Sequence, residues 1–242
     1  AETVALHDII KAESTQAPRQ QPTPLELTHQ LQKPLPLCPY RGLLAFREVD
    51  APIFFGREGF TRQLVEAVQQ QPHVAVIGPS GSGKSSVVFA GLVADLRQEE
   101  SWTVATFRPG SDPFQALSVA LLTLLEAELS EADQLVETRK LTTALRQAEL
   151  PLPDVIDRIL QKSRPTGRLL LVADQFEELY TLCSEPELRR RFLDALLKTV
   201  DRQQFRPEPK FTLVLTLRAD FLGQALSHRP FADALQNADV KL

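Results

Sequence analysis

The chain has 242 residues, of which 43% are hydrophobic and 24% are charged. These proportions are ordinary for a globular protein and argue against a wholly disordered chain, a collagen or a membrane bundle. No apolar run approaches the roughly 20 residues that a transmembrane helix needs, and no signal peptide opens the chain. The net charge of −4 supplies no basic field that would attract nucleic acid. Two cysteines are too few for a disulfide framework, so we expect a reducing, cytoplasmic location.

The first 37 residues differ in composition from the rest of the chain. Five prolines fall between positions 18 and 36, and such a segment cannot sustain a helix or a central strand. We predict an N-terminal extension over residues 1–37, either a linker to an upstream domain or a frayed tail. The folded core is predicted over residues 38–242. The sequence contains no methionine, so we expect a piece of a longer protein.

Four short apolar runs predict strands that are buried on both faces, as in a parallel sheet. These runs are His73–Ile77, Trp102–Phe107, Leu169–Ala173 and Phe211–Leu217. Helical patterns lie between them: a face formed by Phe60, Leu64, Val65 and Val68, a helix from Asp112 to about Leu129, a polar helix over Ser130–Gln147, and a capping box of Ser184 and Glu187 before a fourth helix. The alternation predicts βαβ units and a three-layer α/β fold with a mainly parallel sheet.

The strongest motif follows the first predicted strand. The segment Gly78–Ser85 matches the P-loop pattern G-x-x-x-x-G-K-[ST] and precedes a plausible helix. Its backbone N–H groups and the helix N-terminus would cradle phosphates, Lys84 would reach the β- and γ-phosphates, and the Ser85 hydroxyl would bind Mg²⁺. The candidate nucleotide-binding residues here are Gly78, Pro79, Ser80, Gly81, Ser82, Gly83, Lys84, Ser85 and Ser86. The alternative is a glycine- and serine-rich turn without a binding function.

A second acidic motif follows the strand Leu169–Ala173. Asp174 ends this apolar run, and in P-loop enzymes such an aspartate holds Mg²⁺. A carboxylate just beyond it can orient or deprotonate an attacking water. Glu178 is the first candidate for this catalytic role and Glu177 is the second. The alternative for either residue is an exposed charge at the start of the next helix, where acids favour the helix dipole.

Two further segments carry candidate contacts with the nucleotide. Arg218 follows the strand Phe211–Leu217, and its guanidinium could detect the γ-phosphate and stabilise transferred charge; a surface ion pair with Asp220 is the alternative. In the segment Phe54–Glu58, residues Phe55, Gly56 and Arg57 could hold a base. Arg108 could also reach a phosphate, but nothing in the sequence favours that role over a structural one.

Missing motifs exclude two classes of P-loop protein. A GTPase normally carries an Asn-Lys-x-Asp motif, and the one asparagine of this chain, Asn237, is not followed by lysine. An ABC-type ATPase would need a Leu-Ser-Gly-Gly-Gln signature, which this sequence does not contain.

Together these motifs resemble the STAND class of P-loop ATPases, the signal-transduction ATPases with numerous domains. The resemblance makes Phe54–Glu58 the adenine-contacting motif, Gly78–Ser85 the Walker A motif, Leu169–Glu178 the Walker B motif and Arg218 the sensor arginine. Four segments resemble the bacterial "novel STAND" module in amino-acid sequence: Cys38–Phe46, Val76–Ser86, Asp174–Leu179 and Leu217–Leu222. The resemblance covers residues 38–242 and implies an ASCE-type sheet.

The resemblance also implies a mechanism and partners. ADP would hold a closed monomer, and exchange for Mg-ATP would open it and promote self-association, with slow hydrolysis as the reset. In that class the core continues into a helical lid and a winged-helix region, whereas this sequence ends about where the fifth core strand begins. C-terminal WD repeats as the sensor and an N-terminal effector domain would lie outside this chain. No membrane partner is expected.

Three other functions stay open from the sequence. A nucleotide-binding scaffold without hydrolysis would use the same loop but not Glu177 or Glu178. An AAA+-like ATPase that loads onto DNA would need a basic face, which the negative net charge does not favour. A small-molecule kinase would need an acceptor pocket that no motif identifies.

Overall fold

The computed structural model describes most of the predicted core. The described residues are 42, 44–99, 101–126, 128–163, 167–203, 208–236 and 238–241, without the side chains of 239–241. Contacts divide the chain into Ala1–Pro39 and Tyr40–Leu242, and all described residues lie in the second unit. The extension predicted over residues 1–37 lies outside the described residues.

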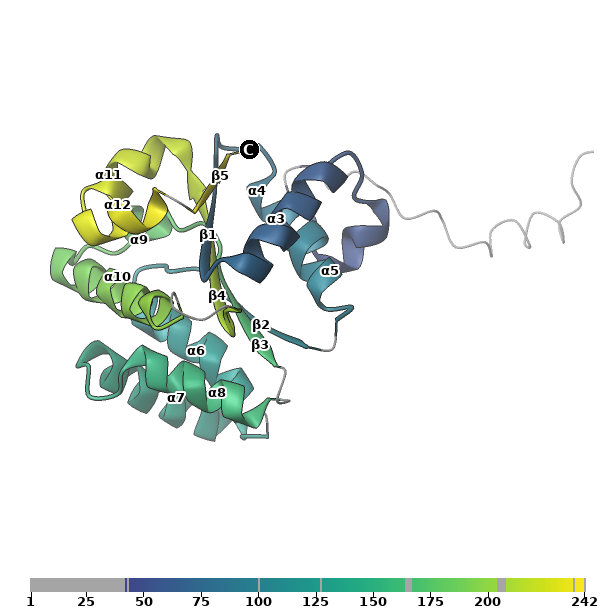
Figure 1. Ribbon diagram of the computed structural model, residues 1–242. Helices are drawn as coiled ribbons and strands as arrows, with labels where there is room; N and C mark the ends of the chain where they lie inside the picture. The colour runs from purple at the N-terminus through teal and green to yellow at the C-terminus, as the bar shows by residue number, and fades with distance from the viewer. Residues whose placement is uncertain are drawn as a thin grey trace, which may run out of the picture. The chain divides into compact units, whose positions relative to one another are not determined.

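A parallel sheet forms the middle layer of this unit (Figure 1). Its five strands lie in the order β2-β3-β4-β1-β5, and every neighbouring pair is parallel. They are β1 (His73–Gly78), β2 (Trp102–Phe107), β3 (Arg168–Ala173), β4 (Phe211–Arg218) and β5 (Asp239–Lys241). The four predicted strands are confirmed. Because β4 lies between β1 and β3, the sheet has the ASCE order that was expected.

Helices cover both faces of the sheet (Figure 1). One face carries η1 (Glu48–Ile53), α3 (Glu58–Gln70) and a continuous helical segment of α4 (Lys84–Ser86), η2 (Val87–Val93) and α5 (Ala94–Leu96). The other face carries α6 (Pro113–Leu125), α7 (Glu131–Arg146), α8 (Leu152–Lys162), α9 (Glu178–Thr181), α10 (Pro186–Asp201), α11 (Leu222–Leu226) and α12 (Arg229–Leu235). The 3₁₀ turn η3 (Ala219–Phe221) joins β4 to α11. The three-layer α/β prediction is therefore confirmed.

Alternation along β1 shows why its residues are apolar on both sides. Val74 and Val76 pack in the core cluster beneath α3 and η2, whereas Ala75 and Ile77 pack in the larger cluster on the opposite face. Side chains point alternately to the two faces of a strand, so a strand covered on both faces needs a continuous apolar run.

The helix predictions hold in part. Asp112 caps α6 as predicted, since its carboxylate accepts a hydrogen bond from the Gln115 N–H at 3.2 Å. However, α6 ends at Leu125 and not at Leu129, because Glu126 leaves helical geometry (φ −140°, ψ 78°). On α3, Leu64 and Val68 are buried as expected, with Phe60 and Val65 partly buried beside them.

Two further differences lie around α8 and α10. The capping box of Ser184 and Glu187 is wrong: Glu185 occupies the cap position and Pro186 opens α10. Glu187 instead pairs with Arg190 and Arg191. Helix α8 was not anticipated, although Val155, Ile156 and Ile159 form a buried helical face.

The helical segment after the P-loop is tightly packed. All seven residues of its π-helical part, Val87–Val93, are buried. A Cβ added at Gly91 would lie 2.5 Å from the Thr61 side-chain oxygen of α3. Glycine therefore lets the two helices approach closely, which fixes the segment that begins at Lys84.

Candidate phosphate and metal site

The P-loop connects the carboxyl end of β1 to the helical segment that starts at Lys84. Gly81 and Gly83 adopt left-handed backbone angles, with φ of +74° and +90°, which other residues adopt only with strain. The Lys84 ammonium folds back over the loop and donates to the carbonyl oxygens of Gly78 (3.0 Å) and Pro79 (2.7 Å). The predicted strand–loop–helix context is therefore present.

Lys84 lies in a low-dielectric position next to an acidic residue. Its side chain is buried, and this burial is the main cause that lowers the pKa of its ammonium. The negative charge of Glu177 opposes that effect and raises the Lys84 pKa more than Asp174 does. Glu177 is thus the acidic group with the greatest electrostatic influence on the P-loop lysine.

The other P-loop hydroxyls have different surroundings. Ser86 accepts a hydrogen bond from the Phe46 backbone N–H at 3.1 Å, so it anchors the segment that precedes α3. The Ser82 hydroxyl oxygen is buried and has no hydrogen-bond partner within the described part of the chain. Pro79 and Ser80 are exposed.

Asp174 is the most connected side chain of the site. It is 1% exposed, and its Oδ1 accepts hydrogen bonds from the hydroxyls of Ser85 (2.6 Å) and Thr216 (2.9 Å). Its Oδ2 faces the Arg108 guanidinium, with the Arg108 Nε at 3.3 Å and a terminal nitrogen at 3.2 Å. Thr216 also accepts from the Gln175 N–H at 2.8 Å. The pairing of Ser85 with Asp174 joins the P-loop helix to β3.

Thr216 and Arg108 were not among the predicted site residues. Thr216 is a polar residue inside the apolar run of β4, and it is 1% exposed. A threonine buried in such a run must find a hydrogen-bond partner, and that signal could have marked it. For Arg108 the sequence offered only its place after a strand.

Glu177 and Glu178 face different neighbours. Glu177 accepts a hydrogen bond from the Arg218 backbone N–H at 3.3 Å. Its negative charge also raises the pKa of Lys84. Glu178 is the first residue of α9, and its carboxylate accepts from the Gly110 N–H at 3.2 Å. The structure therefore directs Glu177 toward the P-loop side and Glu178 toward the loop that follows β2.

Arg218 is engaged with a local partner. Its guanidinium donates to both carboxylate oxygens of Asp220, at 3.1 and 2.6 Å, and lies over the Phe221 ring. These hydrogen bonds hold the pKa of the Asp220 carboxyl below its ordinary value. The ion pair considered as the alternative for Arg218 is thus formed in this structure.

The candidate base-binding segment lies beside the P-loop at one point. An Arg57 terminal nitrogen is 3.5 Å from the Ser82 carbonyl oxygen. Gly56 has a φ of +83°, and its N–H donates to the Glu58 carboxylate at 2.8 Å. The Phe55 side chain is 75% exposed. Arg57 is therefore the member of this segment that the structure brings to the loop.

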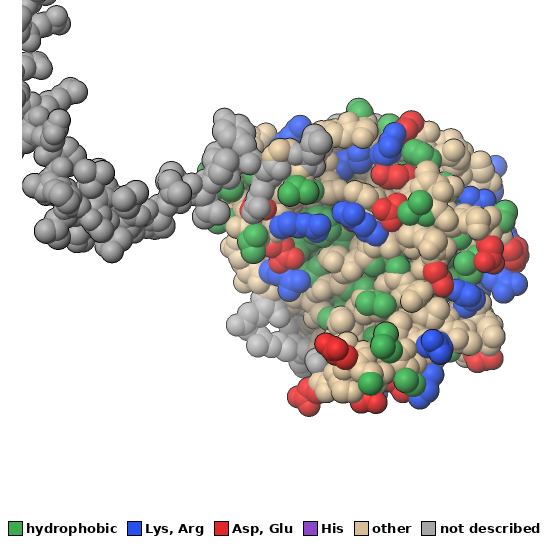
Figure 2. Space-filling view, turned by 180° about the vertical axis from the view of Figure 1, so that it is seen from behind, with side chains coloured by type: hydrophobic (Ala, Val, Ile, Leu, Met, Phe, Trp, Pro, Cys, Tyr) green, Lys and Arg blue, Asp and Glu red, His purple; other side chains and the backbone are tan. Residues whose placement is uncertain are grey.

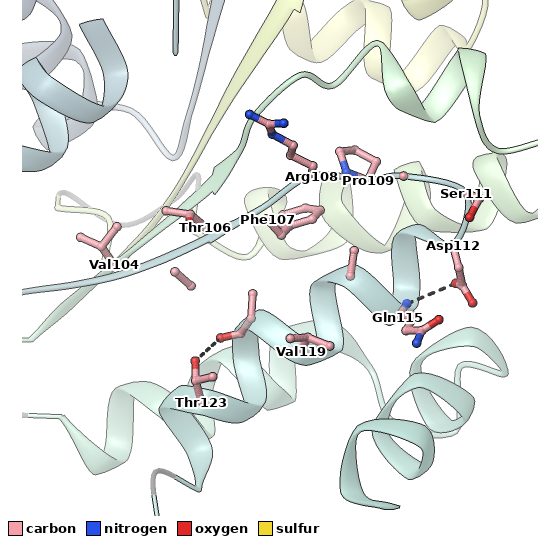
Figure 3. Close-up of a pocket in the computed structure, with 14 residues that line it drawn as sticks. Val104, Thr106, Phe107, Arg108, Pro109, Ser111, Asp112, Gln115, Val119 and Thr123 are labelled. Atoms are coloured by element: carbon pink, nitrogen blue, oxygen red, sulfur yellow. Dashed lines mark hydrogen bonds between the residues drawn. The ribbon is translucent and has the colours of Figure 1, made fainter. Parts of the chain in front are cut away.

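A separate cleft of about 640 Å³ lies between β2 and α6, bordered at one end by the loop that follows β2 (Figure 3). Val104, Phe107, Gln115 and Val119 line it, and no P-loop residue does. In Figure 3 the Arg108 side chain points away from α6. The cleft is therefore distinct from the phosphate site, although it shares a loop with it.

The residues present fit a nucleotide phosphate and Mg²⁺. The unpartnered Ser82 hydroxyl and the open space beside Gly81 and Gly83 leave room and polarity for a phosphate. Ser85 and Asp174 supply the oxygen ligands that Mg²⁺ prefers. The described residues hold no cluster of three or more His, Cys, Asp or Glu side chains.

Comparison with protein families agrees with this geometry. The family model described as Novel STAND NTPase 1 matches residues 39–242. The chain belongs to this family. It is therefore a nucleotide-binding P-loop ATPase module, and the STAND resemblance seen in its motifs is confirmed.

Individual proteins resemble this STAND module over part of their length. The DNA replication and repair protein RecF of Thermomicrobium roseum is 27% identical over 155 residues, which is 61% of this chain and 38% of RecF. The ORC2 protein of Aeropyrum pernix, solved as ADPNP–ADP complexes, has a TM-score of 0.53 at 12% identity, over 78% of this chain and 48% of that one. The Walker-type ATPase PABY2304 of Pyrococcus abyssi has a TM-score of 0.49 at 16% identity, over 81% and 55%.

These partial matches limit what the relatives show. At 12% identity, the ORC2 structure shows the shared fold alone. The STAND module spans about half of their length, or less. Within the described residues, no helix is long and apolar enough to cross a membrane.

Proposed function

We propose that this STAND module binds Mg-ATP, hydrolyses it slowly and acts as a regulatory switch within a larger signalling or defence protein. The observation that carries the proposal is the 2.6 Å hydrogen bond between Ser85 and Asp174. It brings together a P-loop hydroxyl that follows β1 and an acidic residue that follows β3, on the far side of β4, as metal binding with a nucleotide requires. Lys84, already bound to the loop carbonyls, completes the phosphate side.

Each side chain has a separate task in this proposal. The backbone N–H groups from Gly78 to Ser86 bind phosphate oxygens, and Lys84 neutralises the β- and γ-phosphates. Ser85 and Asp174 hold Mg²⁺, which when bound neutralises charge between the phosphates. Arg57, with Phe55 and Gly56, would hold the base, and the contact of Arg57 with the Ser82 carbonyl oxygen supports this role. Binding requires Lys84 to exchange its carbonyl partners for phosphate oxygens.

Hydrolysis needs a group that orients water near the γ-phosphate. Glu177 suits this task better than Glu178. Its carboxylate accepts from the backbone N–H of Arg218, the residue that pairs with Gly78 at the start of the P-loop, whereas Glu178 is bonded to Gly110. This reverses the order suggested by the sequence. Arg218 would stabilise γ-phosphate charge after leaving Asp220.

The switch follows from contacts that ATP makes and ADP does not. A ligand shifts a conformational equilibrium only through different interactions with the two states. In this proposal, Glu177 and Arg218 sense the γ-phosphate. We propose that residues 38–242 form the switch core and residues 1–37 its linker, with self-association, an effector domain and WD-repeat sensors belonging to the larger protein.

Calorimetric titration with ATP and with ADP, each with and without Mg²⁺, tests this function. We expect micromolar binding to the wild-type chain and a loss of at least about 100-fold in Lys84→Ala, because the phosphate charge is then uncompensated. Lys140→Ala is the matched control, since this exposed lysine pairs with Glu137 on α7. Equal affinities for Lys84→Ala and the wild type would refute the proposal.

The observations favour this switch over the other candidates. A scaffold without hydrolysis would leave the placement of Glu177 unexplained. For an ATPase that loads onto DNA, the name of RecF is a hint, but it concerns a protein matched over 38% of its length. On the face in Figure 2, Lys and Arg side chains lie among Asp and Glu side chains rather than in a basic stripe.

A further inference from the structure

The loop that follows β2 contacts both acidic parts of the site. Arg108 pairs with Asp174, and two residues later the Gly110 N–H donates to the Glu178 carboxylate at 3.2 Å. Pro109, between them, is buried. The three-residue segment Arg108–Gly110, here called the β2 loop, is thus held to the Walker B region at two points.

The Arg108 contact uses the carboxylate that the proposed function gives to the metal. Oδ1 of Asp174 is occupied by the hydroxyls of Ser85 and Thr216, and Oδ2 by the Arg108 guanidinium. Asp174 is almost fully buried, whereas the Arg108 side chain is 45% exposed. A positive charge therefore lies on the metal-binding carboxylate from a side that opens to solvent.

A divalent cation at Ser85 and Asp174 would compete with this guanidinium. Two positive charges that share one carboxylate repel each other. A bound metal would also neutralise the negative charge of Asp174 and so weaken its attraction for Arg108. Arg108 can leave the carboxylate, because its half-exposed side chain can move into water. Asp174 stays in place, because Ser85 and Thr216 hold it by hydrogen bonds.

We propose that Arg108 is a positioning residue that occupies the metal-binding carboxylate until Mg²⁺ displaces it. The displacement removes one of the two contacts that hold the β2 loop, so arrival of the metal also weakens the remaining contact between Gly110 and Glu178. This inference rests on the proposed Mg-nucleotide site. It adds that the Arg108 guanidinium, a cation of the protein itself, raises the Mg²⁺ concentration needed for nucleotide binding.

The test is a Mg²⁺ titration at a fixed concentration of fluorescent ADP, followed by binding and not by turnover. In Arg108→Gln we expect the half-saturating Mg²⁺ concentration to fall about threefold to tenfold, the scale of a half-exposed ion pair. Arg108→Lys keeps the charge but loses the planar fork, so it should lie between Gln and the wild type. Arg97→Gln is the control, since Arg97 pairs with Glu48 and is 50% exposed.

Hydrogen exchange gives a second readout that a structural role of Arg108 would not move. The Gly110 amide should exchange faster with Mg-ADP than with ADP in EDTA, because its bond to Glu178 is weakened. A peptide that starts at Arg108 reports this without interference from Pro109, which has no amide proton.

The outcomes separate this inference from the proposed function. If the wild type binds no ADP with or without Mg²⁺, the proposed function fails and this inference falls with it. If ADP binds but the Mg²⁺ requirement of Arg108→Gln equals or exceeds that of the wild type, only the role of Arg108 is overturned. Unchanged or slower exchange at Gly110 overturns the weakening of its contact with Glu178.

Discussion

The ends of β2 and β4 each carry an arginine, but one arginine pairs with a distant acid and the other with a local one. Arg108 follows β2 and reaches across to Asp174 on the neighbouring strand, whereas Arg218 ends β4 and folds back onto Asp220 two residues later. The turn η3 presents Asp220 to Arg218, whereas the nearest acid after Arg108 is Asp112, which caps α6 and pairs with Arg146. Arg218 thus binds an acid two residues away in its own turn. Arg108 binds Asp174 on the neighbouring strand, because the nearest acid in its own loop is already paired with Arg146.

This difference assigns separate roles to the two strand ends. In the proposed function, Arg108 at the end of β2 belongs to the metal side through Asp174, and Arg218 at the end of β4 belongs to the catalytic side, because its N–H donates to Glu177. The experiments below test this division, beginning with the largest expected effect.

Replacing each glutamate by glutamine should separate the two carboxylates. We expect Glu177→Gln to lower the ATP turnover number by about 100-fold to 10,000-fold, the range for loss of a general base. Glu178→Gln should lower it less than about tenfold. Both glutamines can still accept their backbone hydrogen bonds, so the fold should be kept. The measurement is steady-state phosphate release at saturating Mg-ATP.

Two results would contradict the division of roles. If Glu178→Gln had the larger effect, the original sequence ranking would be right and Glu178 would have to leave Gly110 before hydrolysis. If neither variant changed a measurable turnover, the scaffold function would be favoured over the ATPase switch.

The buried threonines of β4 test the metal side. Thr216→Val removes the donor to Asp174 and leaves the Gln175 N–H unpaired. Loss of a group that orients a metal ligand typically costs 10-fold to 100-fold in metal affinity, so we expect about that increase in the half-saturating Mg²⁺ concentration.

Thr212→Val is the matched control on the same strand. Thr212 is equally buried and donates to the carbonyl oxygens of Val68 and Gln71, away from Asp174. Both variants should lose about 1–3 kcal/mol of stability, because each leaves buried polar groups unpaired. A comparable change in Mg²⁺ requirement for Thr212→Val would show that Thr216 acts through general stability and not through Asp174.

The sequence predicted several parts of the fold that depend on local pattern, although it missed α8 and indicated a capping box at Ser184 that is not formed. The strands β1 to β4 were found because burial on both faces demands continuous apolar runs. The cap at Asp112 was found because it depends on residues within one turn. Gly78–Ser85 was found because its pattern lies within eight consecutive residues, and Gly83, one of its two fixed glycines, has a left-handed backbone angle that favours glycine.

The sequence could not predict contacts between distant segments. The pairing of Arg108 with Asp174 depends on β2 lying next to β3, and 66 positions separate the two residues. Likewise, Glu177 and Glu178 are adjacent in sequence, and only the start of α9 turns them toward different neighbours. Strand order and side-chain direction come from the packing of the whole sheet, so residue type and spacing do not determine them.

The smallest expected effect concerns the ion pair at the end of β4. Asp220→Asn should free Arg218 for the γ-phosphate and raise the affinity for ATP relative to ADP by up to about fivefold, since exposed ion pairs contribute little. Calorimetry with ATP and ADP measures this ratio. In an Arg218→Gln background the same substitution should leave the ratio unchanged, because the guanidinium that it releases is gone. If Asp220→Asn instead lowers the ratio, Asp220 holds Arg218 in the orientation used for ATP, and the ion pair is part of the binding state and not a competitor of it.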